Sequence, residues 1–123
     1  MTQLYQEHIM DHYRNPRNQG LVGTPSFYSF AHNALCGDSV EVSGIVVGLR
    51  LVKVGFRGKG CVISQAAASL FCQAMEGKLI PEIMRTGPDD VTKLVGIELG
   101  PVRLKCALLV REALHTGILG MNQ

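Results

Sequence analysis

The segment from Val40 to Phe56 constrains the fold more than any other part of the chain. Residues 40–47 are rich in β-branched side chains, and residues 49–56 alternate Leu51, Lys53 and Gly55 with Val52, Val54 and Phe56. Such runs favour strands, and a glycine between them suits a tight turn. The pattern therefore predicts an antiparallel hairpin around Gly48, and residues 26–33 add a first strand before it.

Helical patterns lie on both sides of this sheet. Residues 4–14 place apolar and aromatic side chains at helical spacing, and Asn15-Pro16 ends the pattern because proline disfavours a preceding helical residue. Residues 63–75 are small and helix-favouring, and Gly77 is typical of a helix end. Pro81 and Pro88 each suit the first turn of a short helix.

A last helix is expected from Pro101 to near Gly117. Its buried positions, by helical spacing, are Val102, Cys106, Leu109, Val110 and Ala113. The order of helix, three strands and further helices predicts an α+β fold, with a small three-stranded antiparallel sheet and helices packed on one of its faces.

Length and composition bound the class of protein. A chain of 123 residues is expected to form one domain, residues 1–123, with a core large enough to fold without disulfides. Its net charge of +2 is spread along the chain, which argues against a nucleic acid or a membrane surface as partner. The first residues do not resemble a secretory signal, so we expect a cytoplasmic protein with reduced cysteines.

The tripeptide Cys36-Gly37-Asp38 places a thiol and a carboxylate two residues apart. Thiolates suit zinc and iron-sulfur clusters, whereas a carboxylate is a harder ligand that would leave a bound cluster releasable. Taken alone, the tripeptide is more simply explained by a turn in which the aspartate hydrogen-bonds its own backbone.

Cys61 follows Gly58-Lys59-Gly60 and stands at the start of the predicted helix over residues 63–75. The free amide donors and the positive end of the helix dipole favour a thiolate there. A nucleotide-binding loop is excluded, since neither the Walker pattern nor the third glycine of a dinucleotide fingerprint is present.

The other cysteines and the histidines allow several interpretations. Lys105 beside Cys106 would favour a thiolate if the two side chains approach each other, but a single cysteine in a helix is more often a core residue. Cys72 lies among apolar residues and is assigned to packing. His8 and His12 are one helical turn apart and could chelate a metal, but no third ligand lies near them in the sequence, which favours a partner-facing or solvated helix face.

Taken together, four motifs resemble one protein family. The motifs are residues 11–20 (DHYRNPRNQG), 36–38 (CGD), 56–64 (FRGKGCVIS) and 102–108 (VRLKCAL). In this order and spacing they resemble the U-type scaffold proteins of iron-sulfur cluster assembly, namely IscU, SufU and the NifU N-terminal domain. The resemblance covers almost the whole chain.

The resemblance implies a site and partners. It implies a transient [2Fe-2S] cluster, or Zn²⁺, held by Cys36, Asp38, Cys61 and Cys106, with Asp38 as the labile ligand. It also implies a cysteine desulfurase that delivers persulfide sulfur, and acceptor proteins that receive the cluster. Cys106 and Cys36 are the candidate persulfide acceptors, with Lys105 as a possible activator of the thiolate.

The chain departs from each branch of that family at a different place. Lys105 stands where the IscU branch has histidine and the SufU branch has lysine, and residues 4–20 also look most like SufU, so the chain resembles that branch most. The insertion that SufU-like proteins usually carry between the second and third cysteines is missing. Residues 99–103 read LGPVR in place of the Leu-Pro-Pro-Val-Lys segment of the IscU branch, which argues against a dedicated Hsp70 chaperone partner.

Two functional hypotheses from different classes follow from these residues. In the first, the chain is an iron-binding scaffold for cluster assembly, which is a binding protein rather than an enzyme. In the second, the same four residues bind zinc and the chain is a sulfurtransferase partner of a cysteine desulfurase. A third interpretation makes the cysteines core residues of an interaction domain.

Overall fold

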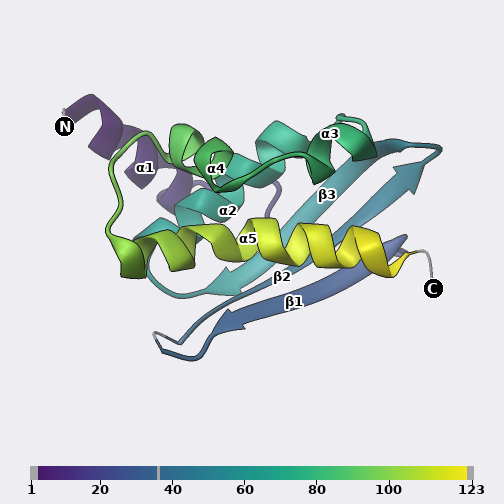
Figure 1. The fold of residues 1–123 in the computed structure, drawn as a ribbon, viewed down its shortest axis with the longest axis horizontal. Helices are drawn as coiled ribbons and strands as arrows, with labels where there is room; N and C mark the ends of the chain where they lie inside the picture. Colours follow the sequence, from purple (N-terminus) through teal and green to yellow (C-terminus); the bar gives the residue numbers. More distant parts are fainter. Residues whose placement is uncertain (1–2, 36, 122–123) are drawn as a thin grey trace.

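The computed structural model describes residues 3–35 and 37–121 and confirms the predicted α+β fold. The three strands form an antiparallel sheet in the order β1-β2-β3, and the helices cover one of its faces (Figure 1). The elements are α1 (Gln3–Arg14), β1 (Phe27–Asn33), β2 (Asp38–Val47), β3 (Arg50–Lys59), α2 (Val62–Met75), α3 (Ile80–Met84), α4 (Pro88–Val95) and α5 (Pro101–Gly120).

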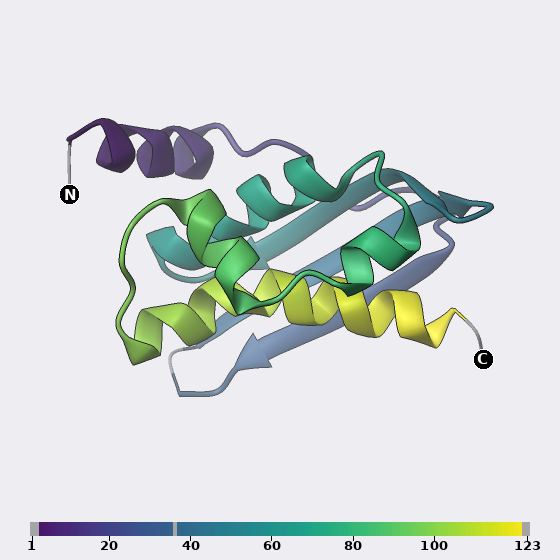
Figure 2. The ribbon, with the colours of Figure 1, turned by 45° about the horizontal axis from the view of Figure 1, so that its top comes forward.

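The core lies between the sheet and the two longest helices. Helix α5 packs on β1 and β2, while α2 packs on β3 and on α5. The side chains of β1 alternate between buried and exposed, as expected for a strand with one face on the core. Helices α3 and α4 lie against α5 and complete the helical layer (Figure 2). Within the described ranges, no helix is long and apolar enough to cross a membrane.

The outer edge of β3 is covered by polar contacts from two other segments. The Glu76 carboxylate accepts from the N–H of Val54 at 3.0 Å, and the Asn18 amide donates to the Val54 carbonyl at 2.9 Å. The same two segments also form backbone hydrogen bonds with β3. Phe56 bonds with residues 18 and 20, and Leu51 bonds with residues 77 and 78. The strand is therefore protected from pairing with another chain at this edge.

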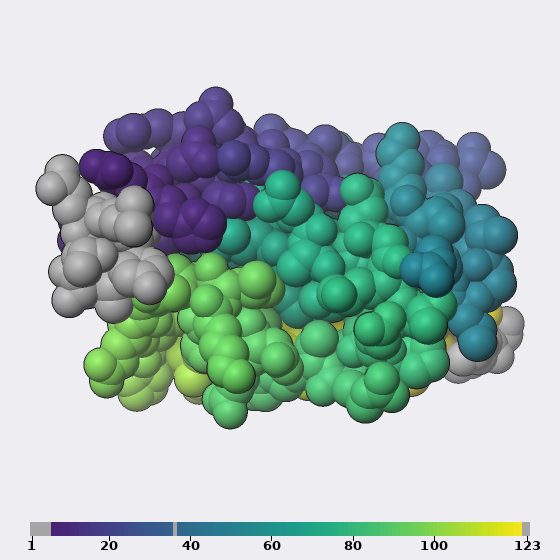
Figure 3. Space-filling model, turned by 90° about the horizontal axis from the view of Figure 1, so that it is seen from above, coloured from purple at the N-terminus to yellow at the C-terminus, as the bar shows by residue number. Residues whose placement is uncertain are grey.

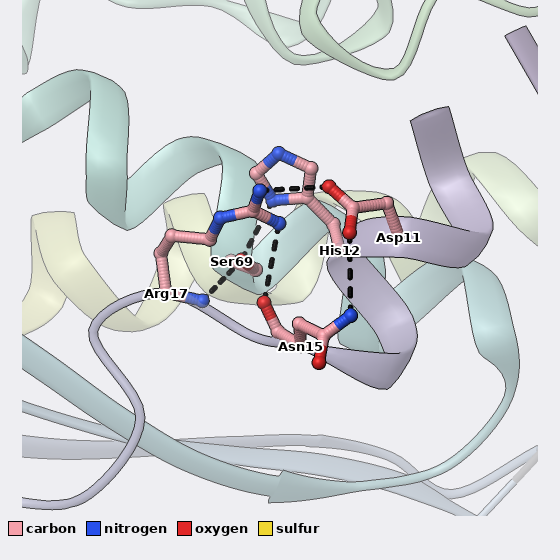
Figure 4. A network of polar contacts seen from close by, with 5 residues as sticks. All are labelled: Asp11, His12, Asn15, Arg17 and Ser69. Atoms are coloured by element: carbon pink, nitrogen blue, oxygen red, sulfur yellow. Dashed lines mark hydrogen bonds and ion pairs between the residues drawn. The ribbon is translucent and has the colours of Figure 1, made fainter. Parts of the chain in front are cut away.

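Helix α1 is anchored to α2 through a buried histidine (Figure 4). The Nδ1 atom of His12 lies 2.7 Å from the hydroxyl of Ser69, which also accepts from the N–H of Arg17 at 2.8 Å. Arg17 in turn pairs with Asp11 at 2.7 Å. Seen from above, the surface of α1 lies directly against that of α2 (Figure 3). The expectation of a solvated or partner-facing surface is thus wrong for His12, because tertiary packing buries it.

Two details of the last helix differ from the sequence-based expectation. The helix continues past Gly117 to Gly120, because Gly117 allows close contact with the ring of Phe27 and does not end the helix. Val102 is 66% exposed, since the first turn of α5 lines a surface pocket and not the core. Cys106, Leu109, Val110 and Ala113 are buried as predicted.

The contact at Gly117 yields a test of the packing of α5 on β1. A Cβ at this position would lie 2.6 Å from Cδ1 of Phe27, so Gly117→Ala should lower the free energy of unfolding by about 1–3 kcal/mol in urea denaturation. Gly120→Ala is the matched control, because open space surrounds it and alanine favours the helix. Equal stability of the two variants would contradict this packing.

The anchor of α1 predicts a pH dependence of stability. Burial lowers the pKa of His12 below its ordinary value of 6.5, and the charges of Arg17 and His8 add to this effect. The unfolded chain therefore binds the proton more readily, and stability should fall as the pH drops through 6.5, by at most about 1.4 kcal/mol per pH unit. His12→Asn should flatten this slope in urea denaturation between pH 7.5 and 5.5.

Burial also lowers the pKa of His115, so this histidine contributes to the same pH dependence of stability. His115→Asn is therefore the comparison that separates its contribution from that of His12. A slope that is unchanged by His12→Asn would show that the buried histidine does not set the pH dependence.

Candidate metal centre

Three potential ligands from separate segments converge at one end of the sheet. Asp38 is the first residue of β2, Cys61 directly precedes α2, and Cys106 lies near the start of α5. One ligand atom from each lies within 4.8 Å of those of the other two. Two sulfurs and a carboxylate oxygen are a donor set that suits zinc or an iron-sulfur cluster.

Asp38 and Cys61 are in direct contact. The backbone N–H of Cys61 donates to Oδ1 of Asp38 at 3.2 Å, and the thiol Sγ lies 3.4 Å from Oδ2. Asp38 is only 2% exposed, so these contacts offset part of the cost of removing its carboxylate from water. A cation between the carboxylate and the sulfurs would offset that cost further.

Cys61 caps the N-terminus of α2, where the sequence placed it. Its backbone is extended, and its sulfur accepts from the N–H of Ser64 at 3.5 Å. The Ser64 hydroxyl donates to the Cys61 carbonyl at 3.1 Å. The cysteine thus takes the position of the usual serine or aspartate cap, where amide donors would stabilise negative charge on the sulfur.

Gly60 makes room for the Asp38 carboxylate. Its φ of +144° lies in a region that favours glycine, and a Cβ on this residue would overlap the Asp38 carboxyl group. The glycine before Cys61 is therefore required by the close approach of β2 and the start of α2.

The group opens onto a surface pocket of about 650 Å³. Cys61 is exposed at the pocket, whereas Cys106 is buried and 3% exposed. The lining residues around the three ligands come from the same three segments and are Gly37, Gly60, Val62, Ile63, Val102 and Arg103. A metal ion or small cluster could enter from solvent and reach both sulfurs.

The remaining predicted site residues have different outcomes. Cys36 lies outside the described residues, and its assignment as a ligand stays a prediction. Lys105 is exposed and lines a separate pocket with His32 and Leu35, so its proposed effect on Cys106 also stays a prediction. Cys72 is fully buried, and burial raises the pKa of its thiol to about 12, which agrees with a packing role.

Sequence reasoning missed the role of Ser64 and the contact of Gly60 with Asp38. A signal for Ser64 was present, because the side chain of an N-cap residue such as Cys61 commonly accepts from the N–H three positions later. No local pattern signals that a residue in β2 touches the chain just before α2, since this contact depends on the register of the β2–β3 pair.

Fold and donor atoms together define a small α+β domain that presents thiols and a carboxylate at one end of its sheet. The sequence profile of the NifU-like N-terminal domain matches residues 4–122, and the chain belongs to this family. The resemblance seen in the four motifs is thereby confirmed.

Relatives and solved structures agree with this family. The chain is 35% identical over 132 residues to the zinc-dependent sulfurtransferase SufU of Bacillus subtilis, covering 94% of this chain and 89% of that protein. It is 28% identical over 115 residues to the iron-sulfur cluster assembly scaffold protein IscU 1 of Archaeoglobus fulgidus, covering 94% and 74%.

A crystal structure from Fervidobacterium islandicum AW-1 has a similar fold. That protein is assigned as an iron-sulfur cluster assembly scaffold for the SUF system, and the structures align with a TM-score of 0.80 at 25% identity. The alignment covers 91% of this chain and 94% of that chain.

The contact between Gly60 and Asp38 predicts the effect of a single methyl group. Gly60→Ala should displace the carboxylate from Cys61 and weaken zinc binding at least about tenfold in a chelator competition. Gly87→Ala is the control, because its backbone is extended and nothing lies near the added methyl. Equal zinc affinity in both variants would contradict the proposed packing of the site.

Proposed function

We propose that this chain is a scaffold for iron-sulfur cluster assembly. The observation that carries the proposal is the group of Asp38, Cys61 and Cys106, whose ligand atoms lie within 4.8 Å of one another beside a surface pocket. Cys36 is assigned as the fourth ligand from the CGD motif. The cluster, a labile [2Fe-2S] species, is the cargo of this site, and relatives named as scaffolds support this assignment.

Asp38 is the ligand best suited to leave. A carboxylate is a harder ligand than a thiolate and binds iron less tightly in a sulfur-rich site. The Asp38 carboxylate also accepts a hydrogen bond from the N–H of Cys61, and this bond does not depend on a metal. Release from the metal would therefore return Asp38 to a satisfied hydrogen bond and not to an unpaired buried charge.

The sulfur source in this proposal is the persulfide of a cysteine desulfurase. A scaffold thiolate attacks the outer sulfur of that persulfide, the S–S bond breaks, and the desulfurase leaves as a thiolate while a persulfide forms on the scaffold. Cys106 and Cys36 are the candidate acceptors. Cys106 is buried at the pocket, so delivery to it would pass through the pocket, whereas Cys61 is exposed.

The completed cluster would then pass to acceptor proteins. The function needs reduced thiols at every step, which fits a reducing compartment such as the cytoplasm. Residues 99–103 give no support for a dedicated Hsp70 chaperone.

The second candidate is a zinc-dependent sulfurtransferase that takes sulfur from the desulfurase. It is favoured by the identity of 35% to a protein of that name and by Lys105, which the SufU branch shares. Two thiols, a carboxylate and a further cysteine fit the tetrahedral ligand set of zinc, which when bound would keep the cysteines as thiolates. The chain's own part would be to hold those thiolates at the pocket and release one for sulfur uptake.

Anaerobic reconstitution distinguishes the two candidates. The protein, with and without prior removal of zinc, is incubated with ferrous iron, cysteine and a catalytic amount of cysteine desulfurase, and visible absorbance and metal content are followed. The scaffold predicts cluster absorbance that Cys61→Ser and Cys106→Ser abolish and that Cys72→Ala retains. Retained zinc, no cluster and faster desulfurase turnover would instead establish the sulfurtransferase.

Substitution of the carboxylate tests its role as the labile ligand. Asp38→Ala should lengthen the lifetime of the reconstituted cluster, measured as the decay of visible absorbance in the presence of a chelator. Asp89→Ala, which removes an exposed carboxylate from α4, should leave the lifetime unchanged. A lifetime that is shortened or unaltered by Asp38→Ala would count against this role.

A further inference from the structure

Gln65 links the beginning of α2 to the end of β3. It lies in the first half of α2, and its half-buried side chain turns back toward the connection that leads into the helix. With the amide oriented to satisfy its hydrogen bonds, the side-chain oxygen accepts from the N–H of Lys59 at 3.0 Å and of Gly60 at 3.3 Å. One side chain therefore binds two successive backbone donors directly before Cys61.

The next donor along the chain belongs to the candidate metal centre. The N–H of Cys61 donates to Oδ1 of Asp38 at 3.2 Å, so three consecutive amides, at residues 59–61, bind only two side chains. Gly60 lies between them with a φ of +144° and no side chain to limit its rotation. The contacts on either side of this glycine fix the direction of the Cys61 amide.

We infer that Gln65 is a positioning residue of the metal centre. By holding the amides of Lys59 and Gly60, it keeps the amide of Cys61 directed at Asp38 and the carboxylate beside the sulfur. This inference rests on the proposed function, because it concerns metal binding at the same site. Gln65 itself is assigned no contact with the metal.

The physical consequence concerns how tightly the site holds a metal. Groups outside the ligand set that orient the ligands typically change metal affinity by about 10- to 100-fold when removed. Without the Gln65 acceptor, Gly60 can rotate and Cys61 moves relative to Asp38. The ligand set is then unchanged, but it is less well arranged before the metal binds, so affinity falls and release becomes faster.

Three variants separate positioning from a general effect on the fold. Gln65→Leu removes the acceptor while keeping a side chain of similar size. Gln65→Glu keeps an oxygen that can accept from both amides and should restore the contact. Gln73→Leu, at an exposed position of the same helix, is the matched control.

The first measurement uses the metal-free protein. Amide hydrogen exchange followed by NMR should show protection at Lys59, Gly60 and Cys61 in the wild type, Gln65→Glu and Gln73→Leu. Gln65→Leu should lose protection at these three residues, while the amides within α2 keep it. Unchanged protection in Gln65→Leu would overturn the inference without reference to any metal.

The second measurement uses zinc and cobalt(II) alone. Gln65→Leu should lower zinc affinity about tenfold in a chelator competition and speed its release, with the thiolate charge-transfer bands of cobalt(II) unchanged in position. Gln65→Glu and Gln73→Leu should stay close to the wild type. Wild-type affinity in Gln65→Leu would overturn the positioning role, whereas no metal binding by the wild type would overturn both this inference and the proposed function.

Discussion

The contact between Asp38 and Cys61 is the interaction on which the candidate site depends. It joins the start of β2 to the start of α2 through a backbone hydrogen bond and a contact between carboxylate and thiol. Gly60 leaves space for this contact, and Gln65 holds the backbone that precedes it. Cys106 completes the group from α5. The buried carboxylate of Asp38 already accepts a hydrogen bond from Cys61, and a bound metal would offset the cost of its burial further.

The fold brings these residues together by sheet register and helix packing. In the β2–β3 pair Ser39 lies opposite Lys59, which places Asp38 beside the connection to α2. Helix α5 crosses β1 and β2 so that its buried face carries Cys106 to the same end of the sheet. Asn18 and Glu76 cover the outer edge of β3, which stabilises the strand from which that connection emerges.

Local patterns predicted most of the fold because strands, turns and helix ends have local causes. The hairpin around Gly48, the helix after Cys61 and the buried position of Cys106 all follow from neighbouring residues. The exposure of Val102, the continuation of α5 through Gly117 and the burial of His12 depend on partners far along the chain, which a single sequence does not reveal. The cysteines are recognisable as candidate ligands from their local motifs. The contacts that support them come from residues distant in the sequence, and these contacts are not recognisable.

The most direct test of the account is X-ray absorption at the zinc edge of the protein loaded with one equivalent of zinc. The account predicts a four-coordinate site with three sulfur ligands at about 2.3 Å and one oxygen at about 2.0 Å, from Cys36, Cys61, Cys106 and Asp38. The same measurement on Asp38→Ala should show that oxygen lost or replaced by a ligand of a different kind, with the sulfurs retained. A site made of nitrogen and oxygen ligands alone would contradict the assignment of the metal centre.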